Sequence, residues 1–466
     1  MRPVVVIGAG VSGLATALAL VRRGIPARVL EESDRVGGSL RTGRAEGYQY
    51  ELGPYALFDN EPKLRELIEQ VGLAAKLQHA SSASGTRHLV LHGALKPLPP
   101  GPKMLTGGPL SFGARMRLLM EVVSSRPASD DESVLDFGRR HVGDEVTRLL
   151  LEPFVGLLYA GDLARLSAKS CFPALYEVER RHGSLVRGVI NEYRQGLRAG
   201  AWLPVGGNVI SFDGGLEELP RAMAARLGDG VRLRTAAARV WPSADGVRIE
   251  LASGEEVSAA SAVLAVPASV GAQLLSGCSP QAEALLKQVP YAPLAVVHLG
   301  FPVAEVSANL RAFGFLVPSS EGLPLRGCVF TSSLFPGRAP EGHCLLSVVL
   351  GGARMPDIVV QPEEALVRMA SSAVRRLLGI PKEPVFAKAS TWPQALPQYE
   401  VGTERRNAAL RSELSRLGPV FFAGNAWDGA FVGECVRRAD AIAEQVAAQL
   451  KRHPRRTMSG VELPRA

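Results

Sequence analysis

The 466-residue sequence predicts an α/β protein with a doubly wound nucleotide-binding domain and at least one further domain. Three observations predict this class. A run of β-branched residues near the N-terminus leads directly into a glycine-rich turn and an apolar helix. Residues 99–200 have a helical pattern, and residues 291–350 contain alternating strand-like segments. A chain of this length exceeds the size of one simple domain, so we expect two or three.

The N-terminal stretch contains a complete dinucleotide-binding pattern. Strand Val4–Ile7 is followed by the turn, the helix Leu14–Val21 and the strand Ala27–Leu30, which ends in Glu31. The turn consists of Gly8, Ala9, Gly10, Val11, Ser12 and Gly13. Its glycines allow a tight turn, close approach to a pyrophosphate and close packing of helix on strand, while Glu31 can accept from a ribose hydroxyl. This pattern predicts a Rossmann-type domain and leaves FAD and NAD open.

The following loop, Asp34–Gly38, favours FAD. Its Arg-x-Gly-Gly sequence resembles the second phosphate loop of glutathione-reductase-type and amine-oxidase-type flavoproteins. Arg35 would neutralise phosphate charge there, and the glycine pair would leave space for the cofactor chain.

Residues 39–98 continue this domain and then leave it. We expect a strand at Tyr48–Leu52, a turn at Gly53–Ala56 that passes beside a flavin, and a helix over Pro62–Val71. Residues 86–98 predict a short hairpin. Arg87 lies at its start; such an arginine is usually a solvated surface group, but its planar fork suits a substrate carboxylate.

Residues 99–200 predict a helical insert. Ser111–Ser125 carries an apolar stripe (Phe112, Met116, Leu119, Met120, Val123), and the apolar run Val146–Tyr159 is interrupted by Glu152-Pro153. Such faces could lie on a membrane. Packing of the stripes on one another is the commoner explanation, and we expect it for any single helix.

The remaining chain returns to the nucleotide domain twice. Residues 211–266 predict a glycine-containing loop, a helix over Glu217–Leu227 and several strands; 291–350 predict an antiparallel sheet; and a helix follows over Pro362–Leu378. The strand that ends near Gly424 leads through a loop to a helix reaching about Leu450, which is a second helix start that favours an anion. The basic tail Arg452–Ala466 has no apolar pattern.

Composition limits the classes of binding partner that the protein can have. The net charge of +8 suits an anionic membrane surface or an acidic small substrate, and no nucleic-acid module is evident in the sequence. The five cysteines are scattered without a metal-ligand spacing, so we expect neither a zinc site nor a disulfide scaffold. No apolar run reaches 18 residues, and the first strand begins at residue 4, which predicts a cytoplasmic protein without a signal peptide.

Several motifs together resemble the oxygen-dependent protoporphyrinogen oxidases over residues 3–450. These are GAGVSGL, LEESDRVGG, ELGP, RHLVLHGALKPLP, YAGDLARLSAKSCFPALY, FDGGLEELP, AFGFLVPSSEG, LPQYEVG and FAGNAWDGAFVGEC. The resemblance implies FAD, a tetrapyrrole substrate and O2, with hydride passing to the flavin and H2O2 as by-product. It also implies peripheral attachment to the inner cell membrane, and it allows a homodimer and hand-off of product to a chelatase.

The same resemblance implies roles for particular residues, with no catalytic residue and no metal ligand among them. The implied substrate contacts are Arg87, Phe313, Gly314, Leu316 and Leu157. The implied cofactor contacts are Gly8, Ala9, Gly10, Val11, Ser12, Gly13, Glu31, Glu32, Arg35, Gly38, Ser39, Gly53, Pro54, Tyr55, Ala56, Val240, Trp392, Gly424, Ala430, Phe431 and Val432.

Domain boundaries follow from these assignments. FAD-binding segments are expected at 1–85, 205–275 and 416–450, the substrate-domain hairpin at 86–98, the helical membrane-binding insert at 99–204, the β-sheet substrate domain at 276–415, and the tail at 451–466.

Two departures from the family pattern leave the substrate open. Leu157 stands where relatives usually have glycine, so its larger side chain would crowd the cavity. Thr403 stands where relatives often have histidine. Protoporphyrinogen IX and coproporphyrinogen III are both candidate substrates. The alternatives are an amine- or carotenoid-type oxidase, for which only Trp392 and Trp427 could form an aromatic cage, and a catalytically silent flavin-bound membrane or assembly protein.

Overall fold

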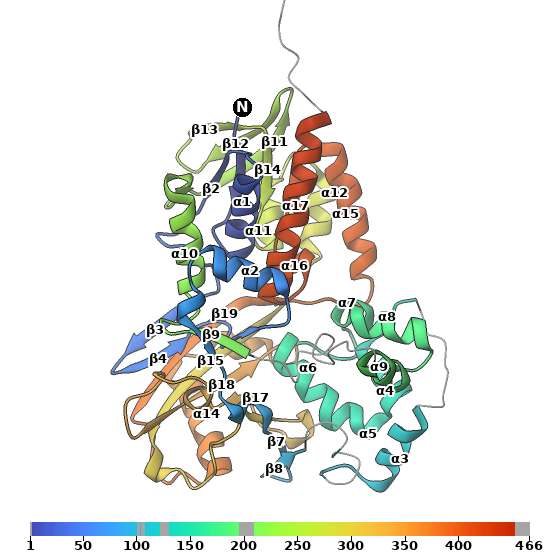
Figure 1. Cartoon of the computed structure of the whole chain (residues 1–466), viewed down its shortest axis with the longest axis vertical. Helices are drawn as coiled ribbons and strands as arrows, with labels where there is room; N and C mark the ends of the chain where they lie inside the picture. Colours follow the sequence, from blue (N-terminus) through green and yellow to red (C-terminus); the bar gives the residue numbers. More distant parts are fainter. Residues whose placement is uncertain (1, 100–102, 104–107, 122–129, 195–208, 453–466) are drawn as a thin grey trace, which may run out of the picture.

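The computed structural model describes residues 2–99, 103, 108–121, 130–194 and 209–452. The chain forms a nucleotide domain, a β-sheet domain and a helical insert, with the nucleotide domain in the upper half of Figure 1 and the other two side by side below it. The basic tail falls almost wholly outside the described residues.

The nucleotide domain is built on a five-stranded parallel sheet. Its order is β10-β2-β1-β14-β20, and every pairing is parallel. The strands are β1 (Val4–Ile7), β2 (Ala27–Leu30), β10 (Val231–Arg232), β14 (Ser261–Leu264) and β20 (Val420–Phe422). All four residues of β1 and of β14 are buried, because both strands have neighbours on each side and are covered on both faces.

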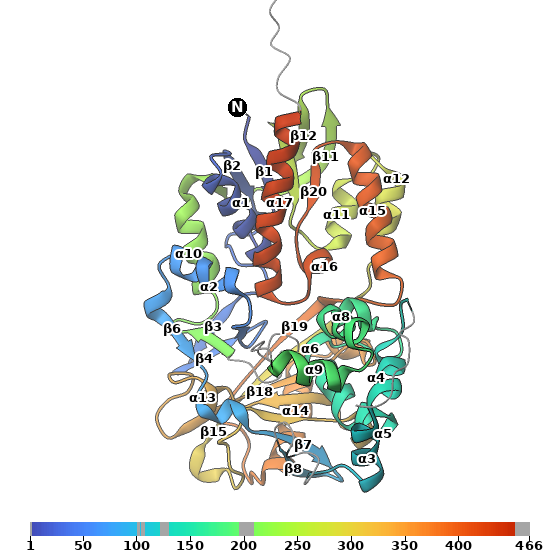
Figure 2. The ribbon, with the colours of Figure 1, turned by 45° about the vertical axis from the view of Figure 1, so that its right-hand side comes forward.

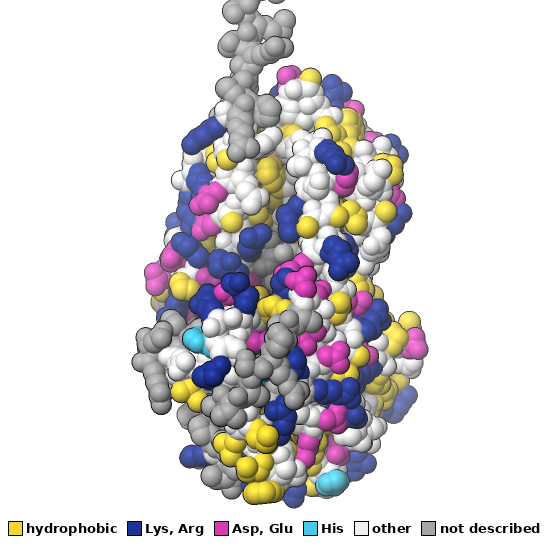
Figure 3. All heavy atoms as spheres, turned by 90° about the vertical axis from the view of Figure 1, so that its right-hand side faces the viewer, with side chains coloured by type: hydrophobic (Ala, Val, Ile, Leu, Met, Phe, Trp, Pro, Cys, Tyr) yellow, Lys and Arg dark blue, Asp and Glu magenta, His cyan; other side chains and the backbone are white. Residues whose placement is uncertain are grey.

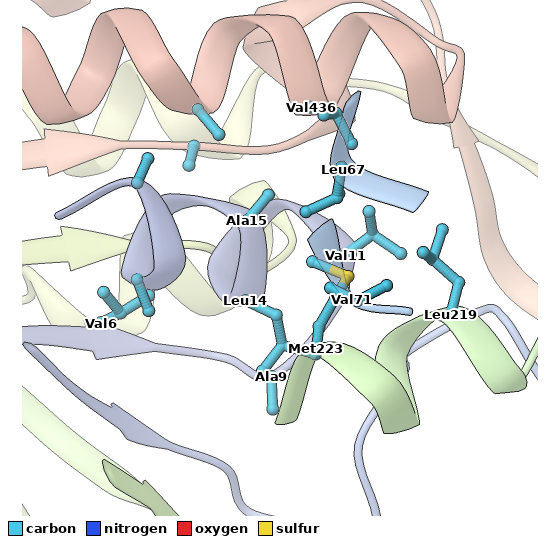
Figure 4. Packing of buried hydrophobic residues seen from close by; sticks show 14 of the residues in the cluster. Val6, Ala9, Val11, Leu14, Ala15, Leu67, Val71, Leu219, Met223 and Val436 are labelled. Carbon is cyan, nitrogen blue, oxygen red and sulfur yellow. The ribbon is translucent and has the colours of Figure 1, made fainter. Parts of the chain in front are cut away.

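Four helices cover one face of this sheet. They are α1 (Val11–Arg22), α2 (Pro62–Gln70), α10 (Glu218–Leu227) and α17 (Val432–Arg452). Figure 4 shows the buried contacts between them: Leu14 of α1 lies towards Met223 of α10, while Leu67 of α2 lies towards Val436 of α17. Alanines on α1 permit this close packing around the fingerprint helix.

The opposite face is covered by a small antiparallel sheet and by four helices. The elements are β11 (Ala237–Ser243), β12 (Gly246–Leu251), β13 (Glu256–Ala259), α11 (Ala268–Leu274), α12 (Pro280–Lys287), α15 (Thr403–Leu417) and α16 (Asn425–Asp428). The expected boundaries placed residues 276–415 in the substrate domain. Leu286 of α12 and Leu410 of α15 are buried in the core of the nucleotide domain instead, because both helices turn an apolar face to it.

The β-sheet domain, called the substrate domain after the function expected of it, is one seven-stranded sheet in the order β19-β15-β18-β17-β16-β7-β8. The strands are β7 (Arg87–Leu91), β8 (Ala94–Leu98), β15 (Tyr291–Pro302), β16 (Gly314–Leu316), β17 (Leu325–Val329), β18 (His343–Gly351) and β19 (Phe386–Pro397). Helix α14 (Glu363–Leu378) covers one face. The sheet is antiparallel as expected, except that β16 and β7 are parallel. The predicted hairpin, β7–β8, forms one edge of the sheet.

Two small sheets connect the domains. Strand β3 (Thr42–Ala45) pairs with β4 (Tyr48–Glu51). Strand β9 (Val209–Phe212) pairs with β5 (Leu57–Phe58) and β6 (Leu77–His79). The sequence does not predict β9, which is too short to show an alternating pattern.

The insert is helical, as predicted, and Figures 1 and 2 both show it beside the lower sheet. Its described elements are α3 (Phe112–Glu121), α4 (Val134–Val142), α5 (Asp144–Val146), a π-helical stretch (Thr147–Leu151), α6 (Glu152–Tyr159), α7 (Ala168–Cys171), α8 (Pro173–His182) and α9 (Leu185–Arg194). The helical path continues through Glu152-Pro153, because Pro153 lies in the first turn of α6, directly after the π-helical stretch.

Helix α3 contradicts the expectation that apolar stripes of the insert pack on one another. Phe112, Met116, Leu119 and Met120 are 78%, 41%, 48% and 58% exposed. Val123, the fifth residue of the expected stripe, lies outside the described residues. Among the described residues, no helix is long and apolar enough to cross a bilayer.

Candidate functional site

The glycine-rich turn has an opening beside it that suits a pyrophosphate. Gly8 has a φ of 104°, and a side chain at Gly13 would overlap the carbonyl oxygen of Gly8, so neither position accepts another residue without strain. A Cβ atom at Gly10 would meet nothing within 4 Å in the described part of the chain. Space is thus kept free where the helix N-terminus presents its N–H groups, and the turn fits a bound dinucleotide.

Glu31 is held at the end of β2 by its own loop. Its Oε2 accepts a hydrogen bond from the Ala9 N–H (2.7 Å), and its Oε1 accepts from the N–H and hydroxyl of Ser33 (3.0 and 2.8 Å). These bonds orient the carboxylate beside the turn, where a ribose would lie. Glu32, the next residue, is exposed.

The loop after Glu31 packs against the turn. The Gly37 N–H donates to the Ala9 carbonyl (2.8 Å), and the Arg35 guanidinium donates to the carbonyls of Val36 (3.1 Å) and Gly38 (2.8 Å). Burial lowers the pKa of Arg35, and the nearby cation Arg41 lowers it further. Arg41, which belongs to no recognised motif in the sequence, therefore adds positive charge beside this loop.

The distant chain segments meet at the lower end of the nucleotide domain. A side chain at Gly53 would overlap the Ser39 carbonyl, and the Trp392 indole N–H donates to the Leu52 carbonyl (2.6 Å). Gly53–Ala56 therefore lies between the phosphate loop and β19.

The C-terminal segment reaches the same region. The ring of Phe431, just before α17, packs edge-on against Phe58 at 5.2 Å between centroids. Ala430 and Val432 flank it, and Gly424, with a φ of 129°, begins the turn after β20. Val240, another expected cofactor contact, lies on β11. It is buried in the core on the face of the parallel sheet that β11, β12 and β13 cover.

An apolar pocket lies where the three bodies meet. Its described lining consists of Tyr55, Phe58, Arg87, Phe154, Leu157, Leu158, Phe313, Gly314, Phe315, Leu316 and Cys328. All five expected substrate contacts belong to this set, together with Tyr55, which was expected to contact the cofactor. The sequence does not predict the other five. Phe154 and Leu158 have the pattern of ordinary core residues of α6, and Phe58 has no expected contact beside it. Phe315 lies between two expected contacts on one strand, and Cys328 lies on β17, which the sequence does not predict.

Arg87 is the only cation in the described pocket lining. Its guanidinium carbon lies 4.8 Å from the centre of the Phe313 ring, and Tyr55 packs edge-on against the same ring at 5.8 Å. Arg87 has neither a hydrogen-bond acceptor nor an ion-pair partner for its side chain among the described residues. Burial lowers its pKa and raises that of Tyr55 to about 12. A partly buried, unpaired guanidinium is costly, and a carboxylate on a ligand would offset that cost.

Helix α6 closes the pocket. Leu157 lies against β17, since its Cδ1 is 3.5 Å from where a Cβ of Gly327 would lie, and the remaining cavity is only about 20 Å³. Glu152, at the start of α6, accepts from the Ser319 N–H and from Arg354 (both 3.0 Å), which ties the helix to the substrate domain. Because pockets for ligands of drug size measure roughly 300–1,000 Å³, α6 or the Leu157 side chain must shift to admit a macrocycle.

Comparison with known families identifies a match over most of the chain. The profile of the flavin containing amine oxidoreductases matches residues 11–447.

Two curated relatives are similar over nearly the whole length. The chloroplastic protoporphyrinogen oxidase of Nicotiana tabacum is 31% identical over 473 residues, covering 96% of this chain and 86% of the relative. The coproporphyrinogen III oxidase of Bacillus subtilis (strain 168) is 28% identical over 467 residues, covering 96% of this chain and 98% of the relative.

Solved structures share the fold. A crystal structure of a protein provisionally assigned as a protoporphyrinogen oxidase, from Exiguobacterium sp. 255-15, superposes with a TM-score of 0.81 at 24% identity and covers 97% of this chain and 99% of its own. A reduced UDP-galactopyranose mutase superposes with a TM-score of 0.74 at 16% identity, covering 96% of each chain. Because the fold is shared by an enzyme named as a mutase, the reaction has to be argued from the pocket.

Proposed function

The chain belongs to the flavin containing amine oxidoreductase family, and from this premise we propose that it is an FAD-dependent oxidase that aromatises a porphyrinogen to the corresponding porphyrin. Protoporphyrinogen IX and coproporphyrinogen III are the two candidate substrates. Relatives named for each of them match this chain at similar identity over similar lengths, so the comparisons do not favour either.

One observation carries the proposal: an unpaired arginine stands at an otherwise apolar pocket beside the predicted flavin site. A porphyrinogen is a large apolar ring system with carboxylate side chains, so it needs both features. Arg87 would hold one carboxylate through paired N–H donors. Phe313, Leu316 and Leu157 would contact the faces of the ring.

The pocket residues would bind and orient the substrate, and FAD, when bound, supplies the hydride-accepting ring and the route for electrons to O2. The described pocket lining contains no carboxylate and no imidazole. The chain's own contribution is therefore positional: Arg87 sets the orientation of the ring, and α6 excludes water once the substrate is enclosed.

An amine substrate fits this pocket poorly. The guanidinium of Arg87 would repel an ammonium group, and a proton-accepting carboxylate is missing from the described lining. Trp392 and Trp427, the only tryptophans considered for an amine cage, do not line the pocket: one donates to the Leu52 carbonyl and the other packs on Phe422.

A direct assay tests the proposed function. Purified holoenzyme is mixed with freshly reduced protoporphyrinogen IX or coproporphyrinogen III in air, and porphyrin fluorescence and H2O2 are followed; putrescine and cyclohexylamine serve as amine probes. We expect porphyrin and peroxide from at least one porphyrinogen and no turnover of either amine. Absence of porphyrin from both would refute the proposal and favour the flavin-bound silent protein.

We also propose that the insert lies on an anionic membrane surface through α3. The exposed apolar side chains of α3 suit insertion among acyl chains. Arg115 and Arg117 of the same helix are partly buried and donate to the carbonyls of Gly108 and Arg140, and they add positive charge behind this apolar face. Figure 3 shows hydrophobic side chains gathered at the lower end of this face of the molecule, with Lys and Arg beside them. A homodimer and hand-off of product to a chelatase stay predictions.

A further inference from the structure

A second and larger cavity lies in the substrate domain, outside the proposed active site. Its volume is about 460 Å³. It lies between the segment after β15 and the turn that joins α13 (Thr331–Leu334) to β18. Its described lining is Val303, Val306, Ala308, Asn309, Leu310, Arg311, Ser332, Ser333, Gly337, Arg338, Ala339, His343 and Cys344. Neither the flavin nor the porphyrinogen needs this space.

Helix α13 separates this cavity from the substrate pocket. Ser332 and Ser333 line the second cavity, whereas Leu334, the next residue, packs in a cluster with Phe313 and Tyr55, which line the first. The two spaces are therefore distinct, and a ligand in one does not occupy the other.

The second cavity carries positive charge. Arg311 and Arg338 supply this charge; His343 also belongs to the described lining, and no aspartate or glutamate does. An anion would therefore enter without meeting a like charge on the wall, while a cation would be repelled.

Arg338 provides a fixed part of this charge. It is 1% exposed, and its Nη2 donates to the Ser211 hydroxyl (2.8 Å) and the Phe212 carbonyl (2.9 Å). Both acceptors are neutral, and Arg338 forms no ion pair within the described residues, although the carboxyl groups of Glu51, Asp213 and Glu218 lie near enough to raise its pKa against the lowering by burial. Its charge is consequently left without a contacting counter-ion, although its hydrogen bonds are made.

Direct donors are provided by more exposed side chains. The guanidinium of Arg311 and the hydroxyl of Ser333 have no hydrogen-bond partner among the described residues. The Asn309 Oδ1 accepts from the Arg311 N–H (2.9 Å), which fixes the turn that carries Arg311. His343 uses Nδ1 towards the Glu341 carbonyl (3.0 Å), so Nε2 is its remaining ring nitrogen.

The rest of the wall is apolar, and it includes Val303, Val306, Ala308 and Leu310. An apolar wall together with a few convergent donors is the usual construction of a small-molecule site, and 460 Å³ lies within the usual size range. We propose that this cavity binds a small amphipathic carboxylate, with the carboxylate on Arg311 and the apolar body against the 303–310 segment. This inference does not rest on the proposed oxidase activity.

A matched series of probes tests the charge requirement. Binding of 2-naphthoate, 2-naphthamide and 2-naphthylmethylamine to the FAD-loaded full chain is measured by ligand-detected NMR and calorimetry. These probes share one ring system and differ in charge. We expect 2-naphthoate to bind at least roughly tenfold more tightly than the amide, the amine to be weakest, and Arg311→Glu to abolish the preference.

Further variants locate the probe. Ala308→Trp should fill the cavity and weaken all three probes. Arg87→Ala should leave 2-naphthoate binding unchanged, and so should Arg248→Glu, which alters an exposed arginine on β12. Bound flavin and far-UV circular dichroism show whether each variant is folded. Equal binding of the three probes, no binding of 2-naphthoate at millimolar concentration, or loss of binding in Arg87→Ala but not in Arg311→Glu would each overturn the proposal.

Discussion

Gly10 and Gly13 stand three residues apart in one turn, yet they are needed for different reasons. At Gly13 a side chain would overlap the protein's own backbone at Gly8, whereas beside Gly10 the described chain leaves open space. The backbone of Gly10 is in an ordinary extended conformation, with a φ of −70° and a ψ of 175°. Gly13 is thus required by the fold, and we infer that Gly10 is required by the ligand.

Substitutions at the two glycines should therefore separate folding from cofactor binding. We expect Gly10→Val to fold with nearly unchanged apoprotein stability and to lose at least roughly tenfold in FAD affinity, because the valine would occupy the place of the pyrophosphate. Gly13→Ala should destabilise even the apoprotein by about 1–3 kcal/mol. Thermal unfolding of the apoproteins and flavin titration measure the two effects. Normal FAD binding by Gly10→Val would show that the cofactor lies elsewhere.

Arg87 should contribute mainly to substrate binding. Loss of a charge-assisted pair costs about 1.5–3 kcal/mol, so Arg87→Ala should lower kcat/KM roughly ten- to hundredfold, with most of the change in KM. Arg87→Lys should recover part of the loss, since it restores charge but not the planar fork.

Steady-state assays with the porphyrinogen that proves active measure this effect, and Arg248→Ala, at an exposed position on β12, serves as the control. Unchanged kinetics in Arg87→Ala would mean that no substrate carboxylate lies at this guanidinium.

At the scale of elements, helix α3 has the clearest consequence. It presents Phe112, Met116, Leu119 and Met120 to solvent, although such residues are normally buried. Exposed apolar side chains gathered on one helix mark an interaction surface.

Replacing two of these residues tests the membrane proposal. We expect Met116→Ser/Met120→Ser to bind phosphatidylcholine–phosphatidylglycerol vesicles at least roughly tenfold more weakly, because each methionine contributes about 1.5–3 kcal/mol when buried. Vesicle sedimentation of the holoenzyme measures this. Val360→Ser, at an exposed valine of the substrate domain, is the matched control. Equal binding by the double variant would contradict the role of α3.

The elements that the sequence predicted well have strong local patterns. β1, β2, α14 and the β7–β8 hairpin lie within one residue of their expected bounds, because buried strands, glycine stops and proline starts are encoded locally. Helix α1 ends within one residue of its expected end but begins three residues earlier, at Val11. β9 was missed because it gains its identity only from partners far away in the chain, β5 and β6. β17 was missed although it pairs with the strands before and after it, because its five residues include Arg326 and Gly327 and show no clear strand pattern. Exposure of α3 could not be inferred either, since an amphipathic pattern does not state what covers its apolar face.

The pocket was predictable to a similar degree. The resemblance over several motifs predicts that Arg87, Phe313 and Leu157 contact the substrate, and in the structure all three line one pocket. It also adds Phe58, Phe154 and Cys328, which have no distinctive sequence pattern, because three-dimensional proximity depends on how the bodies pack.

At the scale of the molecule, Glu51 lies where the separate segments join. Its carboxylate accepts from the Leu216 N–H (2.9 Å) and the Thr42 hydroxyl (2.8 Å), which links the first nucleotide segment to the second. The next carbonyl, that of Leu52, accepts from Ser390 (2.9 Å) and Trp392 of β19. Burial raises the pKa of Glu51 to about 7. The hydrogen bonds from Leu216 and Thr42 and the charge of Arg338 lower this pKa, but burial is the larger effect.

This buried carboxyl group should make stability depend on pH. Because its folded-state pKa is about 7 and its ordinary value is 4.5, the folded state keeps the proton more firmly, and stability falls as the pH rises through that window. At about 1.4 kcal/mol per pKa unit, the free energy of unfolding falls by roughly 3 kcal/mol across this window. We expect Glu51→Gln to be more stable than wild type at pH 8 and to have no such advantage at pH 5. Melting temperatures of both proteins at the two pH values measure this. An equal difference at both would contradict it.

The parallel sheet of the nucleotide domain also determines the order in which the chain can fold and bind its cofactor. β1 lies between strands from residues 27–30 and 261–264, and β20 completes that sheet only at residues 420–422. During synthesis the first strand and its glycine-rich turn must wait for nearly the whole chain before α17 covers them. FAD binding should therefore follow release from the ribosome, and a chain that stops before residue 420 should expose the apolar edge of β14 and be degraded or aggregate.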